Sequence, residues 1–137
     1  MSNKLTIFTD GGARGNPGPA AAAFVIYDEN GNLIEKGGKY LGETTNNSAE
    51  YQAVILALNR AKELGAKSIE FFLDSELIVK QLNRQYKVKD QNLAPLFLKI
   101  WNLSIGFGKI TYSHISRERN KEADAMVNEI LNENIRN

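Results

Sequence analysis

The sequence predicts an α/β fold in which a five-stranded mixed sheet carries helices on its faces, in the order β-β-β-α-β-α-α-β-α. Two observations carry this prediction. The first 41 residues form short alternating or apolar stretches separated by turn formers, as the strands of a meander do. From residue 49 onward, stretches with helical spacing alternate with short apolar stretches, which indicates crossover connections and parallel strands.

Strands and turns account for the first third of the chain. Residues 5–10 alternate between apolar and polar side chains, and residues 20–27 are almost continuously apolar. The stretch between them is rich in glycine and proline and predicts a loop. The expected strands are residues 5–10, 20–27 and 33–41, joined by a loop at 11–19 and a hairpin turn at 28–32, with a bulge or bend at Gly37-Gly38.

Helices and two further strands follow. Apolar residues recur at steps of three and four from Ala49 to Leu64, and Gly65 ends that helix. Asn47 and Glu50 fit the N-cap and N3 positions of a capping box. The remaining expected elements are a strand at 68–73, a helix at 75–83, a helix around 93–101, a strand at 109–115 and a helix from Asn120 to about Leu131, after which residues 132–137 are expected to fray.

Composition sets the class of protein. A chain of 137 residues with 42% hydrophobic and 24% charged residues predicts one globular domain over residues 1–137. There is no apolar run of the roughly 20 residues that a membrane span needs, and no signal-peptide pattern, so we expect a cytoplasmic protein without a membrane partner. The absence of cysteine excludes disulfides and thiolate–zinc sites. The net charge of +1 does not by itself indicate a polyanionic partner.

Four acidic residues stand at the ends of expected elements. Asp10 ends the first strand and Asp74 follows the fourth, and ligands gather at the carboxyl ends of parallel strands. Glu50 and Asp124 lie in the first turns of two helices. Each acid also has a structural explanation: turn initiation for Asp10, an N-cap for Asp74 and a favourable helix dipole for the other two. The residues alone therefore leave both a structural role and a metal site open.

A cluster of these carboxylates would suit metal-dependent phosphodiester cleavage. Mg²⁺ prefers oxygen ligands, and two such ions about 4 Å apart can activate an attacking water and stabilise a leaving oxygen. This chemistry needs no protein nucleophile, which agrees with the absence of cysteine and of a serine–histidine arrangement.

Four segments carry a more specific signal: residues 9–19 (TDGGARGNPGP), 45–50 (TNNSAE), 74–76 (DSE) and 120–124 (NKEAD). In order and spacing they resemble the four motifs of type 1 ribonuclease H, and the likeness covers nearly the whole chain. The resemblance implies a ribonuclease H-like fold and endonucleolytic hydrolysis of the RNA strand of an RNA–DNA hybrid, giving 5′-phosphate and 3′-hydroxyl ends. It also implies a two-metal mechanism with two Mg²⁺ ions, for which Mn²⁺ substitutes.

The same resemblance assigns residues to roles. The metal-binding and catalytic carboxylates would be Asp10, Glu50, Asp74 and Asp124. The substrate-binding residues would be Gly11, Gly12 and Ala13 (backbone against RNA 2′-hydroxyls), Asn16 (minor groove), Thr45 and Asn46 (a phosphate of the DNA strand), and Glu76. Glycine suits close backbone approach, and the 2′-hydroxyl distinguishes RNA from DNA.

Two departures from the family pattern affect substrate contact. Glu76 stands where many relatives carry glutamine, which adds a negative charge near the metals. The segment from Asn83 to Leu96 is short, whereas some relatives have a basic, tryptophan-containing protrusion there. We expect a weaker or different grip on the hybrid, through Tyr86, Lys87 and Lys89.

A third departure concerns the histidine before the fourth motif. His114 matches by count, but residues 110–115 alternate as a strand would, which would fix it in the sheet. Arg117, with Arg119 as a second candidate, could stand closer to the metals. Arginine neutralises a phosphate but does not shuttle a proton near pH 7. Both His114 and Arg117 stay open as catalytic residues.

Other functions fit the sequence less well. One is a ribonuclease H with broadened substrates, including double-stranded RNA. Another is a non-catalytic hybrid-binding module, whose signature would be a missing carboxylate, and none is missing. A third is a different nuclease of the same superfold, against which the glycine loop and residues 45–47 argue. Because one domain would carry a complete site, we expect the protein to be a monomer.

Overall fold

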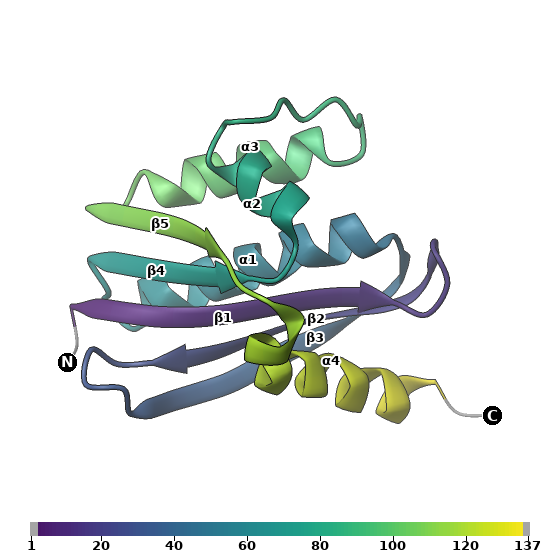
Figure 1. Ribbon diagram of the computed structural model, residues 1–137, viewed down its shortest axis with the longest axis horizontal. Helices are drawn as coiled ribbons and strands as arrows, with labels where there is room; N and C mark the ends of the chain where they lie inside the picture. The colour runs from purple at the N-terminus through teal and green to yellow at the C-terminus, as the bar shows by residue number, and fades with distance from the viewer. Residues whose placement is uncertain (1–2, 136–137) are drawn as a thin grey trace.

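The computed structural model describes residues 3–135 and contains the expected five-stranded mixed sheet (Figure 1). The strand order is β3-β2-β1-β4-β5, antiparallel from β3 to β1 and parallel from β1 to β5. The elements are β1 (Lys4–Ala13), β2 (Gly18–Tyr27), β3 (Leu33–Thr44), α1 (Asn46–Glu63), β4 (Ser68–Leu73), α2 (Glu76–Leu82), α3 (Ala94–Ser104), β5 (Lys109–His114), the short 3₁₀ helix η1 (Arg117–Asn120) and α4 (Lys121–Asn134).

The sheet has a hydrophobic core on each face. In Figure 1, α1 lies behind the sheet and α4 crosses in front of β2 and β3. Phe24 and Ile26 of β2 belong to the larger core with α1 and α3, whereas Ala21 and Ala23 pack against α4. Successive strand residues point to opposite faces, so β2 is buried on both sides. Its alanines leave room for helices to pack closely on the sheet.

The strands β1 and β2 are longer than the sequence indicated. The expected loop at 11–19 is wrong at both ends, because β1 continues to Ala13 and β2 begins at Gly18. Gly11, Gly12 and Ala13 pair with alanines of β2, and the Arg14 N–H donates to the Pro19 carbonyl. Backbone pairing with a neighbouring strand thus outweighs the turn preference of the glycines.

The bulge expected at Gly37-Gly38 is also wrong. The pairing of β2 with β3 is continuous there, and its irregularities lie at Ala20/Ala21 and Ile26/Tyr27. The two glycines instead leave room for neighbouring side chains. A Cβ on Gly37 would lie 2.5 Å from the Phe24 ring, and a Cβ on Gly38 would lie 2.6 Å from the Ile130 side chain of α4.

The start of α1 differs from the expected capping box. The N-cap is Thr45, whose side chain accepts a hydrogen bond from the Ser48 backbone N–H at 3.2 Å. Asn47 is already helical, so the Asn47–Glu50 box is wrong and Glu50 is available for another role. Similarly, Ser75 caps α2, and Asp74 stands one residue outside it.

The last helix is longer than expected. It continues to Asn134, so the fraying expected from residue 132 is wrong for residues 132–134, and 136–137 lie outside the described residues. Arg14 donates a hydrogen bond to Asn132 at 2.7 Å, and Ile135 packs on the smaller core. These contacts hold the end of α4 on the sheet. Over residues 3–135, none of the helices has the length and apolar character that crossing a bilayer requires.

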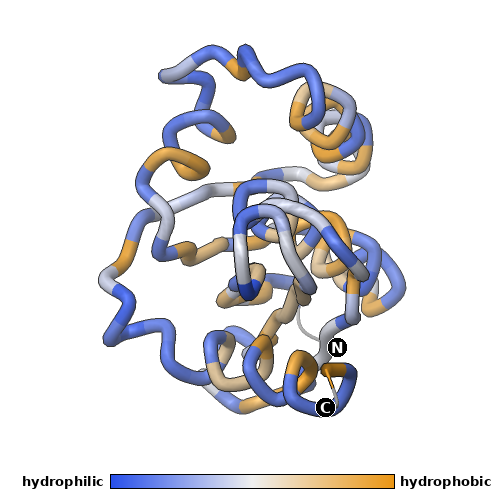
Figure 2. The backbone as a smooth tube through the Cα atoms, turned by 90° about the vertical axis from the view of Figure 1, so that its right-hand side faces the viewer, coloured by the Kyte–Doolittle hydropathy of each residue, from blue (hydrophilic) through white to orange (hydrophobic). Residues whose placement is uncertain are grey.

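Although Leu93 is buried in the larger core, most of the long connection from α2 to α3 is exposed. It runs along the top of Figure 2, where it is coloured mostly as hydrophilic. Its Tyr86 and both lysines, Lys87 and Lys89, are exposed. The Lys80 ammonium lies 5.0 Å from the centre of the Tyr86 ring, and Arg84 lies 4.6 Å from that of Trp101, so cation–π contacts hold the first part of this segment against helices α2 and α3.

Candidate metal centre

Three of the four expected carboxylates meet at one edge of the sheet. Asp10 lies in β1 and Asp74 directly follows β4, its parallel neighbour, while Glu50 reaches them from α1. One carboxylate oxygen from each of these residues lies within 4.8 Å of the others. Asp124, on the first turns of α4, is outside this group but lines the same pocket. We call this hollow the acidic pocket.

The close approach of β1 to α1 brings Asp10 and Glu50 together. A Cβ on Gly11 would lie 2.2 Å from the Ala49 carbonyl carbon, so only glycine allows the two backbones to come this close. The Gly11 backbone N–H also favours the charged form of the Glu50 carboxyl and so partly opposes the rise in its pKa. A glycine directly after Asp10 therefore sets the position of an acid on another element.

Burial and mutual repulsion disfavour the charged forms of two of these acids. Burial, followed by the charge of Asp74, raises the pKa of Asp10 from 3.8 to about 7. Burial, followed by the charge of Asp10, raises the pKa of Glu50 well above its ordinary value. Such crowding of acids is unfavourable unless a cation relieves it.

The donor set fits a hard divalent cation. All three groups offer carboxylate oxygens, the ligands that Mg²⁺ and Ca²⁺ prefer. Oε2 of Glu50 is buried and has no hydrogen-bond partner among residues 3–135. A buried acceptor without a donor is costly, and a metal ion would satisfy it.

The end of β1, the β1–β2 connection and the start of α1 form a polar rim beside the acids. Gly11, Gly12 and Ala13 line the acidic pocket together with Asn46. The Asn46 side-chain oxygen accepts the Ala13 N–H at 2.8 Å, and the Asn16 side-chain oxygen accepts the Asn46 N–H at 3.0 Å. Both oxygens are thus occupied, and the NH₂ groups remain to donate to a ligand, as phosphate recognition requires. Thr45 serves as the helix cap.

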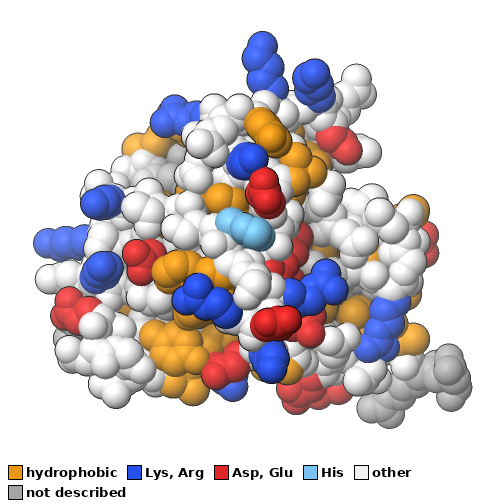
Figure 3. All heavy atoms as spheres, in the orientation of Figure 1, with side chains coloured by type: hydrophobic (Ala, Val, Ile, Leu, Met, Phe, Trp, Pro, Cys, Tyr) orange, Lys and Arg blue, Asp and Glu red, His pale blue; other side chains and the backbone are white. Residues whose placement is uncertain are grey.

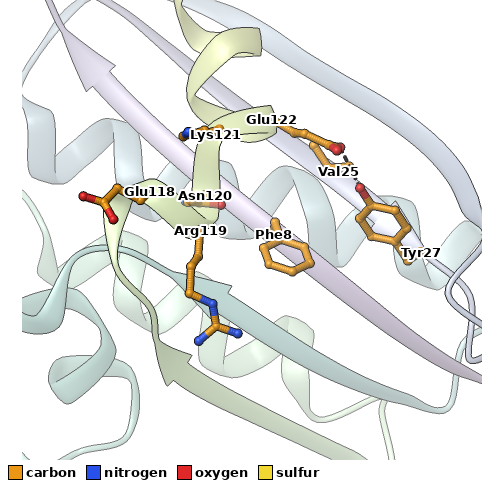
Figure 4. A pocket seen from close by; sticks show the side chains of 8 residues that line it. All are labelled: Phe8, Val25, Tyr27, Glu118, Arg119, Asn120, Lys121 and Glu122. Carbon is orange, nitrogen blue, oxygen red and sulfur yellow. Dashed lines mark hydrogen bonds between the residues drawn. The ribbon is translucent and has the colours of Figure 1, made fainter.

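The structure distinguishes His114 from the arginines that follow it. As expected, His114 lies in the sheet, at the end of β5, and the only imidazole of the chain is exposed on the face shown in Figure 3. It is not among the residues lining the acidic pocket, whereas Arg117 is. Arg119 lines a second pocket on the other side of η1, where its side chain lies beside Phe8 (Figure 4).

Two expected substrate contacts lie farther from the acids. Glu76 is exposed and forms an ion pair with Lys80 at 2.9 Å, which lowers the pKa of the Glu76 carboxyl. Lys80 therefore offsets the extra negative charge that Glu76 brings. The lysines of the α2–α3 connection are absent from the lining of the acidic pocket.

Sequence reasoning missed two asparagines on either side of Asp124. The Asn128 side chain donates to the Asp124 backbone carbonyl at 3.1 Å, a contact that the spacing of four on a helix could have indicated. Asn120 belongs to the fourth motif, but its side chain contacts β1 and Asp74, which only the tertiary fold brings near.

Comparison with known proteins agrees with this fold. A family model described as reverse transcriptase-like matches residues 8–130. Ribonuclease HI of Halobacterium salinarum is 39% identical over 130 residues, which cover 95% of this chain. A ribonuclease H of Ehrlichia chaffeensis is 33% identical over 90% of this chain and 92% of its own length. This chain spans 65% of the length of the halobacterial relative and 35% of that of three mycobacterial relatives.

Solved structures show the same architecture. The crystal structure of the halobacterial RNase H1 matches with a TM-score of 0.92 and 38% identity, over 95% of this chain and 98% of that one. LC11-RNase H1, whose structure is a complex with an RNA/DNA hybrid, matches with a TM-score of 0.90 and 44% identity, over 94% and 97% of the two chains. The fold is thus that of the reverse transcriptase-like class. Within it, the chain belongs to the type 1 ribonuclease H family.

Proposed function

We propose that this chain is an endonuclease that hydrolyses the RNA strand of RNA–DNA hybrids and leaves 5′-phosphate and 3′-hydroxyl ends. The observation that carries the proposal is the group of Asp10, Glu50 and Asp74 at the edge of two parallel strands, with an unpartnered buried oxygen on Glu50 among the described residues. Asp124, in the same pocket, completes a set of four carboxylates for two divalent cations.

Each part of the acidic pocket has a role in this reaction. Bound Mg²⁺ ions, or Mn²⁺ in their place, would supply a water activated for attack and stabilisation of the leaving oxygen. The four carboxylates hold the ions, and Arg117 neutralises a phosphate of the substrate. The backbone from Gly11 to Ala13 approaches the 2′-hydroxyl groups, which selects RNA as the cleaved strand.

The DNA strand lies, in this proposal, along the polar rim. The NH₂ group of Asn46 donates to a backbone phosphate oxygen, and Thr45 adds a hydroxyl at the N-terminus of α1, where the helix dipole favours an anion. Asn16, which accepts the Asn46 N–H, lies near the minor groove. An RNA–DNA hybrid fits this arrangement best, because only its RNA strand presents 2′-hydroxyl groups to the backbone of residues 11–13. The complex of LC11-RNase H1 with an RNA/DNA hybrid supports the choice of substrate.

A cleavage assay on matched duplexes tests the proposal. The same sequence is supplied as RNA–DNA hybrid, double-stranded RNA and double-stranded DNA, each with Mg²⁺ or Mn²⁺. We expect cleavage of the RNA strand of the hybrid, with end-labelled products that carry 5′-phosphates. Cleavage of double-stranded RNA at a similar rate would broaden the substrate class, and cleavage of double-stranded DNA alone would refute the proposal.

Variants of the carboxylates test the site itself. Asp10→Asn should abolish cleavage while hybrid binding persists, because the amide keeps the shape but loses the metal-binding charge. Glu129→Gln is the matched control: Glu129 is an exposed acid on α4, the helix of Asp124, and is not among the residues lining the acidic pocket. Metal-dependent cleavage by Asp10→Asn would refute the assigned role.

We also propose that the protein acts as a cytoplasmic monomer. One chain supplies all four carboxylates and the polar rim, so no second copy is needed to complete the site. Sedimentation at the concentrations used for the cleavage assay would test the oligomeric state.

A further inference from the structure

Asn120 is a buried polar residue with an unusual position. It ends η1, precedes the first residue of α4 and is 1% exposed. Asparagine at a helix start usually caps it by accepting a backbone N–H of the first turn. Here the side chain makes no capping hydrogen bond, so its burial needs another explanation.

The Asn120 amide instead connects the elements that carry the acids. Its Nδ2 donates to the Thr9 backbone carbonyl at 2.9 Å and to Oδ2 of Asp74 at 3.1 Å. Thr9 directly precedes Asp10 in β1, and Asp124 follows Asn120 by about one helical turn. One side chain therefore joins β1, the end of β4 and the start of α4.

These bonds fix the orientation of the Asp74 carboxylate. A neutral donor on Oδ2 restrains rotation of the carboxylate, which leaves Oδ1 to face a metal ion without introducing another charge. Hydrogen bonds in a buried site are strong, and their loss leaves unsatisfied groups behind. Groups that orient metal ligands typically change metal affinity or activity about 10–100-fold when removed.

We propose that Asn120 is a positioning residue for the metal centre, which orients Asp74 and sets the distance of α4, and hence of Asp124, from Asp10. This inference rests on the proposed function. Asn120 does not touch the substrate or the reacting atoms in this role; it acts through the carboxylates that do.

Two variants and one matched control test this role. Asn120→Ala removes both hydrogen bonds, and Asn120→Asp keeps the size but loses the donor and faces Asp74 with a like charge. Gln81→Ala is the control, because Gln81 is a similarly buried amide whose oxygen accepts the Tyr51 hydroxyl at 2.6 Å, outside the acidic pocket. All three variants should lower the melting temperature.

Mn²⁺ binding distinguishes a positioning role from a general loss of stability. It is measured by electron paramagnetic resonance in the absence of substrate. We expect both Asn120 variants to weaken it about tenfold or more, and kcat for the hybrid to fall by a similar factor with KM within about twofold. Gln81→Ala should leave metal binding and kcat unchanged. Wild-type Mn²⁺ affinity in either folded Asn120 variant would overturn the proposal.

The wild-type protein provides a test that does not depend on a variant folding. The side-chain amide resonances of Asn120 should shift when Mg²⁺ is added, and those of Gln81 should not. An Asn120 amide that does not respond to Mg²⁺ would also overturn the proposal. If the wild type binds metal but cuts no hybrid, the proposed function fails while the positioning role can still be judged from metal binding.

Discussion

Asp10 is an acid whose environment opposes its charge. It is 6% exposed, and its pKa of about 7 lies far above the 3.8 of an unfolded chain. The folded state therefore binds a proton on this carboxyl more tightly than the unfolded state does. The stabilisation that results is complete below about pH 4 and is lost as the pH rises through 7, in the absence of metal.

Replacement of Asp10 should accordingly stabilise the metal-free protein. We expect Asp10→Asn in EDTA to raise the free energy of unfolding at pH 8 by on the order of 1–4 kcal/mol, with the difference vanishing near pH 4. Thermal melts across this pH range measure the effect, with Glu129→Gln as control. An Asp10→Asn variant no more stable than the wild type at pH 8 would contradict the raised pKa.

Arg117 and Arg119 are two residues apart in the sequence and line different pockets. We expect Arg117→Ala to lower kcat/KM for the hybrid about tenfold or more, since a charged hydrogen-bond partner of the phosphate is lost. Arg119→Ala, from the second pocket, should change it less than about twofold. His114→Ala belongs in the same series of steady-state assays. A larger loss with His114→Ala than with Arg117→Ala would reverse the assignment.

At the scale of elements, the contact between β1 and α1 determines the geometry of the site. Gly11→Ala would place a methyl group against the Ala49 backbone, and overpacking of this kind costs about 1–3 kcal/mol or more. We expect a lower melting temperature and weaker Mn²⁺ binding. Gly12→Ala is the matched control for folding, because its Cβ would meet Val127 at an ordinary 3.7 Å. Equal melting temperatures for the two variants would show that the backbones can move apart.

The element order could be predicted because periodicity is local. Residues 20–27 and 68–73 are apolar enough to identify strands, and the strand at 109–115 ends within one residue of its expected position. The extension of β1 to Ala13 could not be predicted, because its cause is pairing with alanines of β2. The preference of glycine for turns therefore misled the local interpretation.

The sequence allowed the acidic residues of the site to be predicted, but not the contacts that position them. The motif spacings gave Asp10, Glu50 and Asp74, which the fold brings within 4.8 Å of one another. The roles of Gly11 and Asn120 depend on contacts between residues far apart in the chain. Gly11 approaches the Ala49 backbone and Asn120 donates to the Thr9 carbonyl, and neither contact produces a periodic pattern in the sequence.

For the whole molecule, charge limits how strongly a polyanion can bind. The net charge is +1, and the lysines and arginines on the face in Figure 3 are scattered rather than gathered in one patch. We expect the logarithm of hybrid affinity to fall with the logarithm of salt concentration with a slope of only about −2 to −4, equivalent to a few phosphate contacts. Fluorescence anisotropy with the Asp10→Asn protein at several salt concentrations measures this slope. A slope steeper than about −6 would contradict the expectation.

The lysines of the α2–α3 connection should account for part of that slope. Joint substitution of Lys87→Ala and Lys89→Ala is expected to make it shallower by about 1–2, because each lysine neutralises one phosphate. Lys62→Ala with Lys67→Ala, two exposed lysines outside this connection, is the control. An unchanged slope after substitution of Lys87 and Lys89 would show that this segment does not contact the phosphates of the hybrid.

The parallel pairing of β1 with β4 also governs when the acidic pocket can form during synthesis. Lys4 pairs with Ser68, so β1 can pair with β4 only after β4 has been synthesised. In contrast, β2 can pair with β1 as soon as β2 emerges from the ribosome. Asp10 meets Asp74 only after α1 has been made, and Asp124 arrives later still. The acids therefore stay apart while most of this domain is synthesised, and the acidic pocket is complete only once α4 has left the ribosome.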